Sequence, residues 1–164
     1  MNKSDFRKKI TDSWFSYLQS QICKEFDILE GSKFKFKRRD WIKKNKKEGG
    51  GTSYILSGGK IFDKVGVNKS TVSGIFPKKF RKNILGAGKN GKYWASGVSV
   101  VAHMRNPKIP ALHFNTRFIV TSKEWFGGGM DATPSFNDSK EKKIIHDQLK
   151  KIWKQNKKNN KKYK

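Results

Sequence analysis

WASGVSVVAHMRNPKIPALHFNTRFIVTSKEWFGGGMDATP, residues 94–134, contains two strand-like runs separated by a proline-containing connection. Polar side chains occupy alternate positions in both runs, with Ser99 and His103 in the first and His113, Asn115 and Arg117 in the second. Alternate strand residues lie roughly 6–7 Å apart on the same side of a strand, so these side chains are expected to face one common space. An ordinary half-buried strand would present Lys, Glu or Thr to solvent. The row of His, Asn and Arg therefore indicates a functional site.

The opposite side of the second run carries Phe114, Thr116 and Phe118, which suit a hydrophobic core. Downstream, Gly127–Gly129 are expected to form a turn that returns Asp131 to the end of this strand, next to Thr133. The sequence thus predicts one concave surface built from six residues. They are Ser99, His103, His113, Asn115, Arg117 and Asp131.

The remaining sequence pattern predicts an α+β fold in which helices flank an antiparallel β-sheet. The first helix is expected to start near Ser4 or Asp12 and to end near Phe26, with an apolar stripe of Trp14, Leu18, Ile22 and Phe26. A second helical pattern covers residues 137–154. Strands are expected around Phe34 and Phe36 and at 54–56, 60–65, 72–75, 95–103 and 113–120.

The charge of the chain by itself favours a polyanionic partner. The 38 Lys and Arg residues exceed the 13 Asp and Glu residues, which gives a formal charge of +25. A small basic nucleic-acid-binding protein is therefore the alternative hypothesis. Much of the excess lies near the C-terminus, and residues 154–164 are expected to form a disordered Lys- and Asn-rich tail.

The single cysteine, Cys23, excludes an internal disulfide and fits a reducing compartment. It falls on the apolar side of the first helix, where a buried structural thiol is expected. No apolar run approaches the ~20 residues of a membrane span, so a cytoplasmic protein is expected. The run from Gly86 to Tyr93 has the spacing of a phosphate-binding loop, but Tyr93 stands where a magnesium-binding Ser or Thr is needed, so a surface loop is expected.

Five sequence blocks, in order and spacing, resemble the oxygen-dependent coproporphyrinogen III oxidase family over residues 14–153. The blocks are GGGTSYIL at 49–56, GKIFDKVGVN at 59–68, GVS at 97–99, the run from His103 through Asn106-Pro107 to HFNTR at 113–117, and WFGGGMD at 125–131. The resemblance implies an enzyme that decarboxylates two propionates of coproporphyrinogen III to vinyl groups. Molecular oxygen accepts the electrons, and the product is protoporphyrinogen IX of haem biosynthesis.

The resemblance also implies roles for the polar row. His113 matches the family's proton donor, and Ser99, Asn115 and Arg117 are expected to bind substrate. Asp131 is expected to act in catalysis by accepting hydrogen bonds from pyrrole N–H groups. From the residues alone, a purely structural pairing of Arg117 with Asp131 is the alternative. The chemistry is expected to require no organic cofactor, with O₂ as co-substrate.

A divalent metal ion is a further implication, because His103, His113 and His146 match three of four histidines proposed as metal ligands in bacterial members. The family pattern continues for roughly as many residues again, including a Gly-Gly-Arg segment and the helix of a homodimer interface. Residues 1–153 are therefore expected to form the N-terminal half of the family's domain, apparently truncated on its C-terminal side. The chain alone is expected to have little or no oxidase activity.

Overall fold

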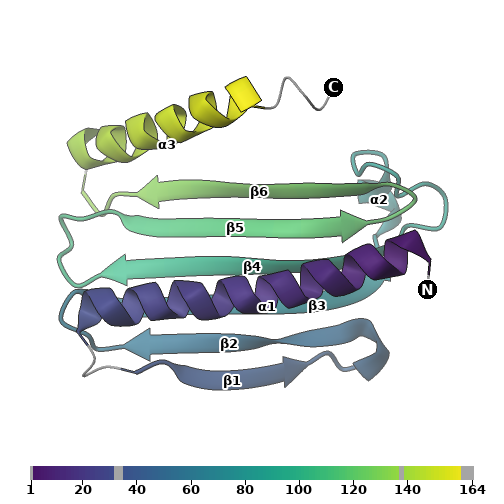
Figure 1. The fold of residues 1–164 in the computed structure, drawn as a ribbon, viewed down its shortest axis with the longest axis horizontal. Coiled ribbons are helices and arrows are strands. Elements are labelled where there is room, and N and C mark those ends of the chain that lie inside the picture. Colours follow the sequence, from purple (N-terminus) through teal and green to yellow (C-terminus); the bar gives the residue numbers. More distant parts are fainter. Residues whose placement is uncertain (1, 32–34, 137–138, 160–164) are drawn as a thin grey trace.

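The computed structural model describes residues 2–31, 35–136 and 139–159. Six strands form one fully antiparallel sheet in which each strand pairs with its neighbour in sequence (Figure 1). The expected α+β class is confirmed. The elements in chain order are α1 (Lys3–Glu30), β1 (Lys37–Ile42), a 3-10 helix η1 (Lys46–Glu48), β2 (Gly49–Ser57), β3 (Phe62–Ile75), α2 (Lys78–Arg81), β4 (Lys92–Met104), β5 (Ala111–Val120), β6 (Glu124–Thr133) and α3 (Ser139–Asn159).

The core lies between α1 and one face of the sheet. The helix lies over β3 and β4, with its axis nearly along the strand direction (Figure 1). Strand residues that face α1 alternate with residues on the opposite side of the sheet. We call this opposite side, which points away from α1, the distal face. The buried apolar residues of the core are Phe15, Cys23, Leu56, Phe62, Val65, Val67, Val98, Val100, Ala102, Phe118 and Val120.

Helix α1 is longer than expected, and its buried line is displaced by one residue from the expected apolar stripe. Asn2 caps its start, accepting a hydrogen bond from the backbone N–H of Asp5 at 2.8 Å. The buried positions are Thr11, Phe15, Gln19, Cys23 and Glu30. The expected core residue Trp14 is instead 53% exposed, whereas Leu18, Ile22 and Phe26 pack at the margin of the core.

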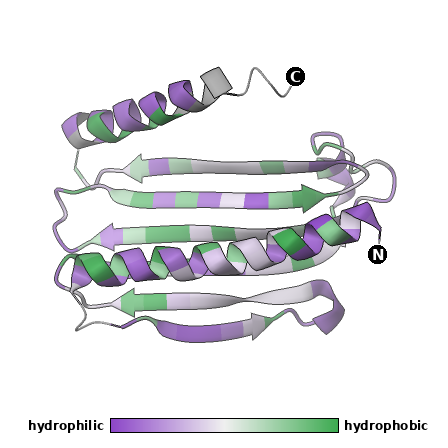
Figure 2. Ribbon diagram, in the orientation of Figure 1, coloured by the Kyte–Doolittle hydropathy of each residue, from purple (hydrophilic) through white to green (hydrophobic). Residues whose placement is uncertain are grey.

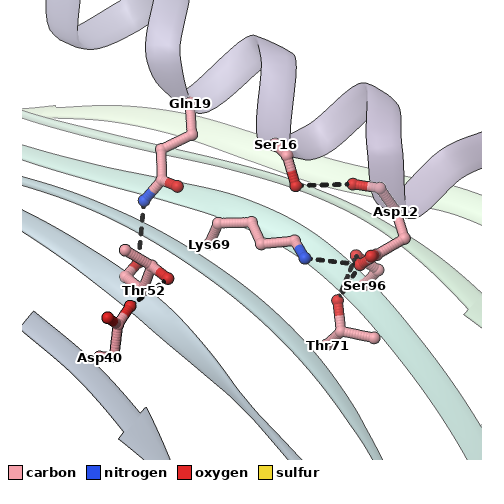
Figure 3. Close-up of polar contacts among 8 residues, drawn as sticks. All are labelled: Asp12, Ser16, Gln19, Asp40, Thr52, Lys69, Thr71 and Ser96. Atoms are coloured by element: carbon pink, nitrogen blue, oxygen red, sulfur yellow. Dashed lines mark hydrogen bonds and ion pairs between the residues drawn. The ribbon is translucent and has the colours of Figure 1, made fainter.

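Polar residues were absent from the expected stripe because their burial depends on partners in the sheet (Figure 3). Gln19 Nε2 donates to the carbonyl oxygens of Thr52 and Val67 at 2.8 and 2.9 Å. Two turns earlier, Asp12 accepts hydrogen bonds from Lys69, Ser96 and the hydroxyl of Thr71. These bonds tie α1 to strands β2, β3 and β4.

Glu30 closes the other end of α1 against the turn between β2 and β3. Its side chain is 3% exposed, and its carboxylate accepts hydrogen bonds from the backbone N–H groups of Lys60, Ile61 and Phe62. Burial alone would raise the pKa of Glu30, but these three donors hold it below its ordinary value. A side chain at Gly59 would place its Cβ 2.5 Å from the Glu30 carboxyl carbon, so the contact requires glycine there.

Two strand assignments from sequence need correction. The strands expected at 60–65 and 72–75 belong to one strand, β3, which begins at Phe62 and continues through the polar run between them. Gly127–Gly129 do not form a turn; they lie inside β6, and the chain reverses at residues 121–123. Both errors have one cause, since Gly, Asn, Lys and Ser have low strand propensity and were placed in the ladder by neighbouring strands.

The first expected strand also differs, because β1 begins at Lys37, while Phe34 lies outside the described residues. β1 is an edge strand with a largely hydrophilic sequence (Figure 2), and its Lys and Arg side chains disfavour pairing with another sheet. At the other edge, α3 contacts β6 and extends to Asn159, so residues 154–159, expected in a disordered tail, are helical. No helix within the described residues is long and apolar enough to cross a membrane.

Candidate functional site

The cross-strand register places all six residues of the expected surface on the distal face. Ser99 lies opposite Asn115, and His113 lies opposite Asp131. Arg117, two residues beyond Asn115, lies opposite Gly127. Because side chains alternate along each strand, Arg117 and Asp131 share one face of the sheet, as the sequence predicted. The glycine run contributes by pairing with β5 as a strand, not by reversing the chain.

A hollow of about 240 Å³ lies on the distal face over β3, β4 and β5. Ser99, Asn115 and Arg117 line it, together with Gly97 at its centre. A Cβ at Gly97 would lie 2.5 Å from the carbonyl oxygen of Thr116 and 2.9 Å from Cβ of Arg117. The absence of a side chain at Gly97 thus leaves room for the hollow and for the close approach of β5. His103, His113 and Asp131 lie on the same face outside its lining.

Arg117 is exposed, and its guanidinium Nη2 donates to Oδ1 of Asn115 at 2.7 Å. The structural alternative, an Arg117–Asp131 pair, is not formed. Asp131 lies opposite a residue four positions before Arg117, a separation of about 13 Å along the strand. Asn115 therefore orients the guanidinium while leaving its other N–H groups open to a ligand.

His113, Asp131 and His103 form a second polar group beside the hollow. The imidazole centroids of His103 and His113 are 6.2 Å apart in an edge-to-face arrangement. Thr133 donates a hydrogen bond to Oδ2 of Asp131 at 3.0 Å. This bond lowers the pKa of Asp131, and the charges of Lys142 and His113 act in the same direction. The carboxylate is consequently ionised at neutral pH and can accept hydrogen bonds.

The expected three-histidine metal set is not assembled. His103 and His113 are neighbours, but His146 lies on α3. Within the described ranges, no group of three or more His, Cys, Asp or Glu side chains is placed to hold a metal ion. Among the described residues only the pair His103 and His113 is brought together, and a metal site that includes His146 stays a prediction.

Sequence reasoning missed the β3 side of the hollow, which Asn68, Ser70 and Val72 line. Asn68 lies directly opposite Ser99, and Ser70 lies opposite Gly97. Alternation of polar residues at 68 and 70 was a usable signal. The alternation is not apparent in the sequence because the intervening Lys69 and Thr71 are also polar. These two side chains point toward α1 and bind Asp12.

Two other sequence features have structural roles. The thiol of Cys23 is buried, and burial, with the charge of Asp27, raises its pKa to about 12, so it remains protonated and a poor nucleophile. The surface loop expected at 86–93 begins beside the β5–β6 reversal, which contacts Leu85 and Gly86. There, the hydroxyls of Thr121 and Ser122 donate to the carbonyl oxygens of Leu85 and Gly86.

Comparison with known proteins identifies relatives of the chain. Residues 10–164 match a family model described as Coproporphyrinogen III oxidase. The chain is similar to the oxygen-dependent coproporphyrinogen-III oxidase of Rickettsia typhi (strain ATCC VR-144 / Wilmington), with 49% identity over 148 residues, covering 85% of this chain and 52% of the relative. The same figures hold for the Rickettsia prowazekii (strain Madrid E) protein. The Rickettsia bellii (strain RML369-C) protein is 46% identical over 154 residues, covering 89% and 53%. The chain spans about half the length of the curated relatives it matches.

Proposed function

Because this chain belongs to the coproporphyrinogen III oxidase family, we propose that its distal face binds coproporphyrinogen III for oxygen-dependent decarboxylation. In this reaction two propionates become vinyl groups, giving protoporphyrinogen IX. Each propionate loses CO₂, while two electrons and two protons pass to O₂ and form hydrogen peroxide. The nucleic-acid-binding alternative gains no support from the matched family or from the relatives.

The substrate carries four carboxylates, so it requires cationic and hydrogen-bonding partners. Arg117 binds one propionate through its planar guanidinium, whose geometry matches a carboxylate. Asn115 holds that guanidinium, and Ser99 adds a neutral hydrogen bond from the neighbouring strand. Support for this arrangement comes from the hollow that all three residues line.

Asp131 and His113 act on the macrocycle. The ionised carboxylate of Asp131 accepts hydrogen bonds from pyrrole N–H groups and stabilises positive charge as electrons leave the ring. His113, its direct cross-strand neighbour, transfers a proton at the reacting propionate. The depressed pKa of Asp131 supports its part, since a protonated carboxyl group could not supply this charge.

The observation that carries the proposal is the shared distal face. The guanidinium of Arg117 suits a carboxylate, and the carboxylate of Asp131 can accept hydrogen bonds from ring N–H groups. The strand positions of these two residues lie about 13 Å apart along β5 and β6. A tetrapyrrole presents both kinds of group, with carboxylates at its rim and N–H groups at its centre. One substrate can therefore contact both.

The co-substrate and the cofactor requirement are proposed to be those of the family. O₂ is the co-substrate, and the electron-rich tetrapyrrole supplies the electrons without an organic cofactor. The proposal assigns no step to a metal ion. We also propose a cytoplasmic location and a homodimer for the complete protein.

Binding and catalysis can be tested separately. The purified chain should bind coproporphyrin III, the fluorescent oxidised form of the substrate, with saturation in a fluorescence titration. Oxidation of coproporphyrinogen III should be measured for the chain alone and for the chain joined to the second half of the Rickettsia typhi relative. We expect protoporphyrin only from the joined protein, because the chain spans half of the matched length. A folded chain with no saturable porphyrin binding would overturn the proposal.

A further inference from the structure

The side chain of Asn68 has the placement of a ligand-binding group without a protein partner. Asn68 is half-buried on the distal face and lies directly opposite Ser99. Its amide can donate two hydrogen bonds and accept two. Among the described residues, none of this capacity is used by another side chain or by the backbone. The amide is not sealed in the interior but lines the hollow, so water or a ligand there can use its hydrogen-bonding groups.

The hollow over Gly97 has two walls, and Arg117 belongs to only one of them. Asn115 and Arg117 rise from β5, whereas Asn68 and Ser70 rise from β3. The register makes Ser70, Gly97 and Arg117 successive members of one row across three strands. Strands two apart are separated by about 10 Å, which leaves a carboxylate-sized gap between side chains that reach inward from both walls.

The two walls offer complementary hydrogen bonds to a carboxylate. Its two oxygens can accept about four hydrogen bonds, and the fork of Arg117 supplies two of them. The remaining acceptor positions are free for partners other than Arg117, and β3 supplies the opposite wall of the hollow. A neutral amide can fill such a position without adding a second charge to the hollow.

We propose that Asn68 is a substrate-binding residue, whose side-chain amide donates a hydrogen bond to the propionate carboxylate that Arg117 holds. This inference rests on the function proposed above. It assigns β3, in addition to β4 and β5, to substrate recognition. Ser70 contributes its hydroxyl from the same wall.

The test is coproporphyrin III binding to the full 164-residue chain, measured by fluorescence titration. Asn68→Asp keeps the shape of the side chain but turns a donor into a second carboxylate facing the ligand carboxylate. Asn68→Ala removes the amide. Ser53→Ala is the matched control, because Ser53 lies opposite Asn68 in the same row but outside the hollow. Arg117→Lys reports on the proposed function itself.

We expect Asn68→Asp to weaken binding by about tenfold or more, Asn68→Ala by several-fold, and Ser53→Ala by less than about twofold. Thermal unfolding and circular dichroism of all variants should match the wild type. Unchanged affinity in Asn68→Asp, with weakened binding in Arg117→Lys, would overturn the inference alone. Loss of affinity that only follows loss of folding would assign Asn68 a structural role instead. An unaffected Arg117→Lys variant would overturn the proposed carboxylate site, and with it the role of Asn68.

Discussion

His113 and Asp131 are direct cross-strand neighbours on the distal face, although they are separated by a complete hairpin reversal. Asp131 reaches this position because β6 remains a strand through Gly127–Gly129. Thr133 binds the Asp131 carboxylate from two residues further along the strand. The imidazole of His113 and the carboxylate of Asp131 are thereby held at a spacing set by the backbone hydrogen bonds of two paired strands.

Replacing Arg117 by Lys should weaken substrate binding about tenfold or more while changing turnover less. An ammonium group cannot form the two parallel hydrogen bonds of a guanidinium, and it cannot keep the same bond to Asn115. KM and kcat should be measured in the chain joined to the second half of a relative. Arg39→Lys, an exposed distal-face change on β1, is the control and should leave both constants unchanged. A fall confined to kcat would contradict the binding role.

Asp131→Asn should act mainly on turnover. The amide nearly keeps the shape of the carboxylate but removes the charge that stabilises the oxidised ring, so we expect kcat to fall about a hundredfold and KM to change little. Asp63→Asn, at the exposed start of β3, serves as the control. A change in KM alone would show that Asp131 only helps to bind the substrate.

Glu30→Gln should destabilise the fold without touching the distal face. The neutral amide oxygen accepts weaker hydrogen bonds from the backbone N–H groups of the β2–β3 turn. The new NH₂ group is itself a donor and cannot accept a hydrogen bond from these N–H groups. We expect a loss of about 1–3 kcal/mol in the free energy of unfolding, measured by urea denaturation. Glu25→Gln, exposed on the same helix, should have almost no effect. Equal stabilities of the two variants would show that the turn does not depend on the carboxylate.

The contribution of Asp12 should disappear in acid. Burial would raise its pKa, but Lys69, Thr71 and Ser96 hold the pKa below its ordinary value of 3.8. A carboxyl group with a depressed folded-state pKa stabilises the protein above its unfolded-state pKa, and this stabilisation is lost as the pH falls through the folded-state value. The difference in Tm between the wild type and Asp12→Asn should therefore be full at pH 6 and shrink below about pH 3.8. A difference that stayed constant down to pH 2.5 would show that the carboxylate charge is not responsible.

The α+β class and the polar face of β4 and β5 can be predicted from the amino-acid sequence alone. Alternation with a period of two fixes which side chains share a face, and in these two strands the apolar positions, such as Val100 and Phe118, mark the core side clearly. The family resemblance followed from the same residues, and the matched relatives confirm it.

Which other residues share that face follows from contacts made in the folded protein. Asn68 and Ser70 lie in a run where both sides of the strand are polar, because the core side carries Lys69 and Thr71 bonded to Asp12 on a distant helix. Gly127–Gly129 have no strand propensity of their own and are held in β6 by pairing with β5. For Asn68 and Ser70 the deciding interactions are hydrogen bonds to a helix distant in sequence, and for the glycines they are the backbone hydrogen bonds of the β5–β6 hairpin. The propensity of the local residues contains neither.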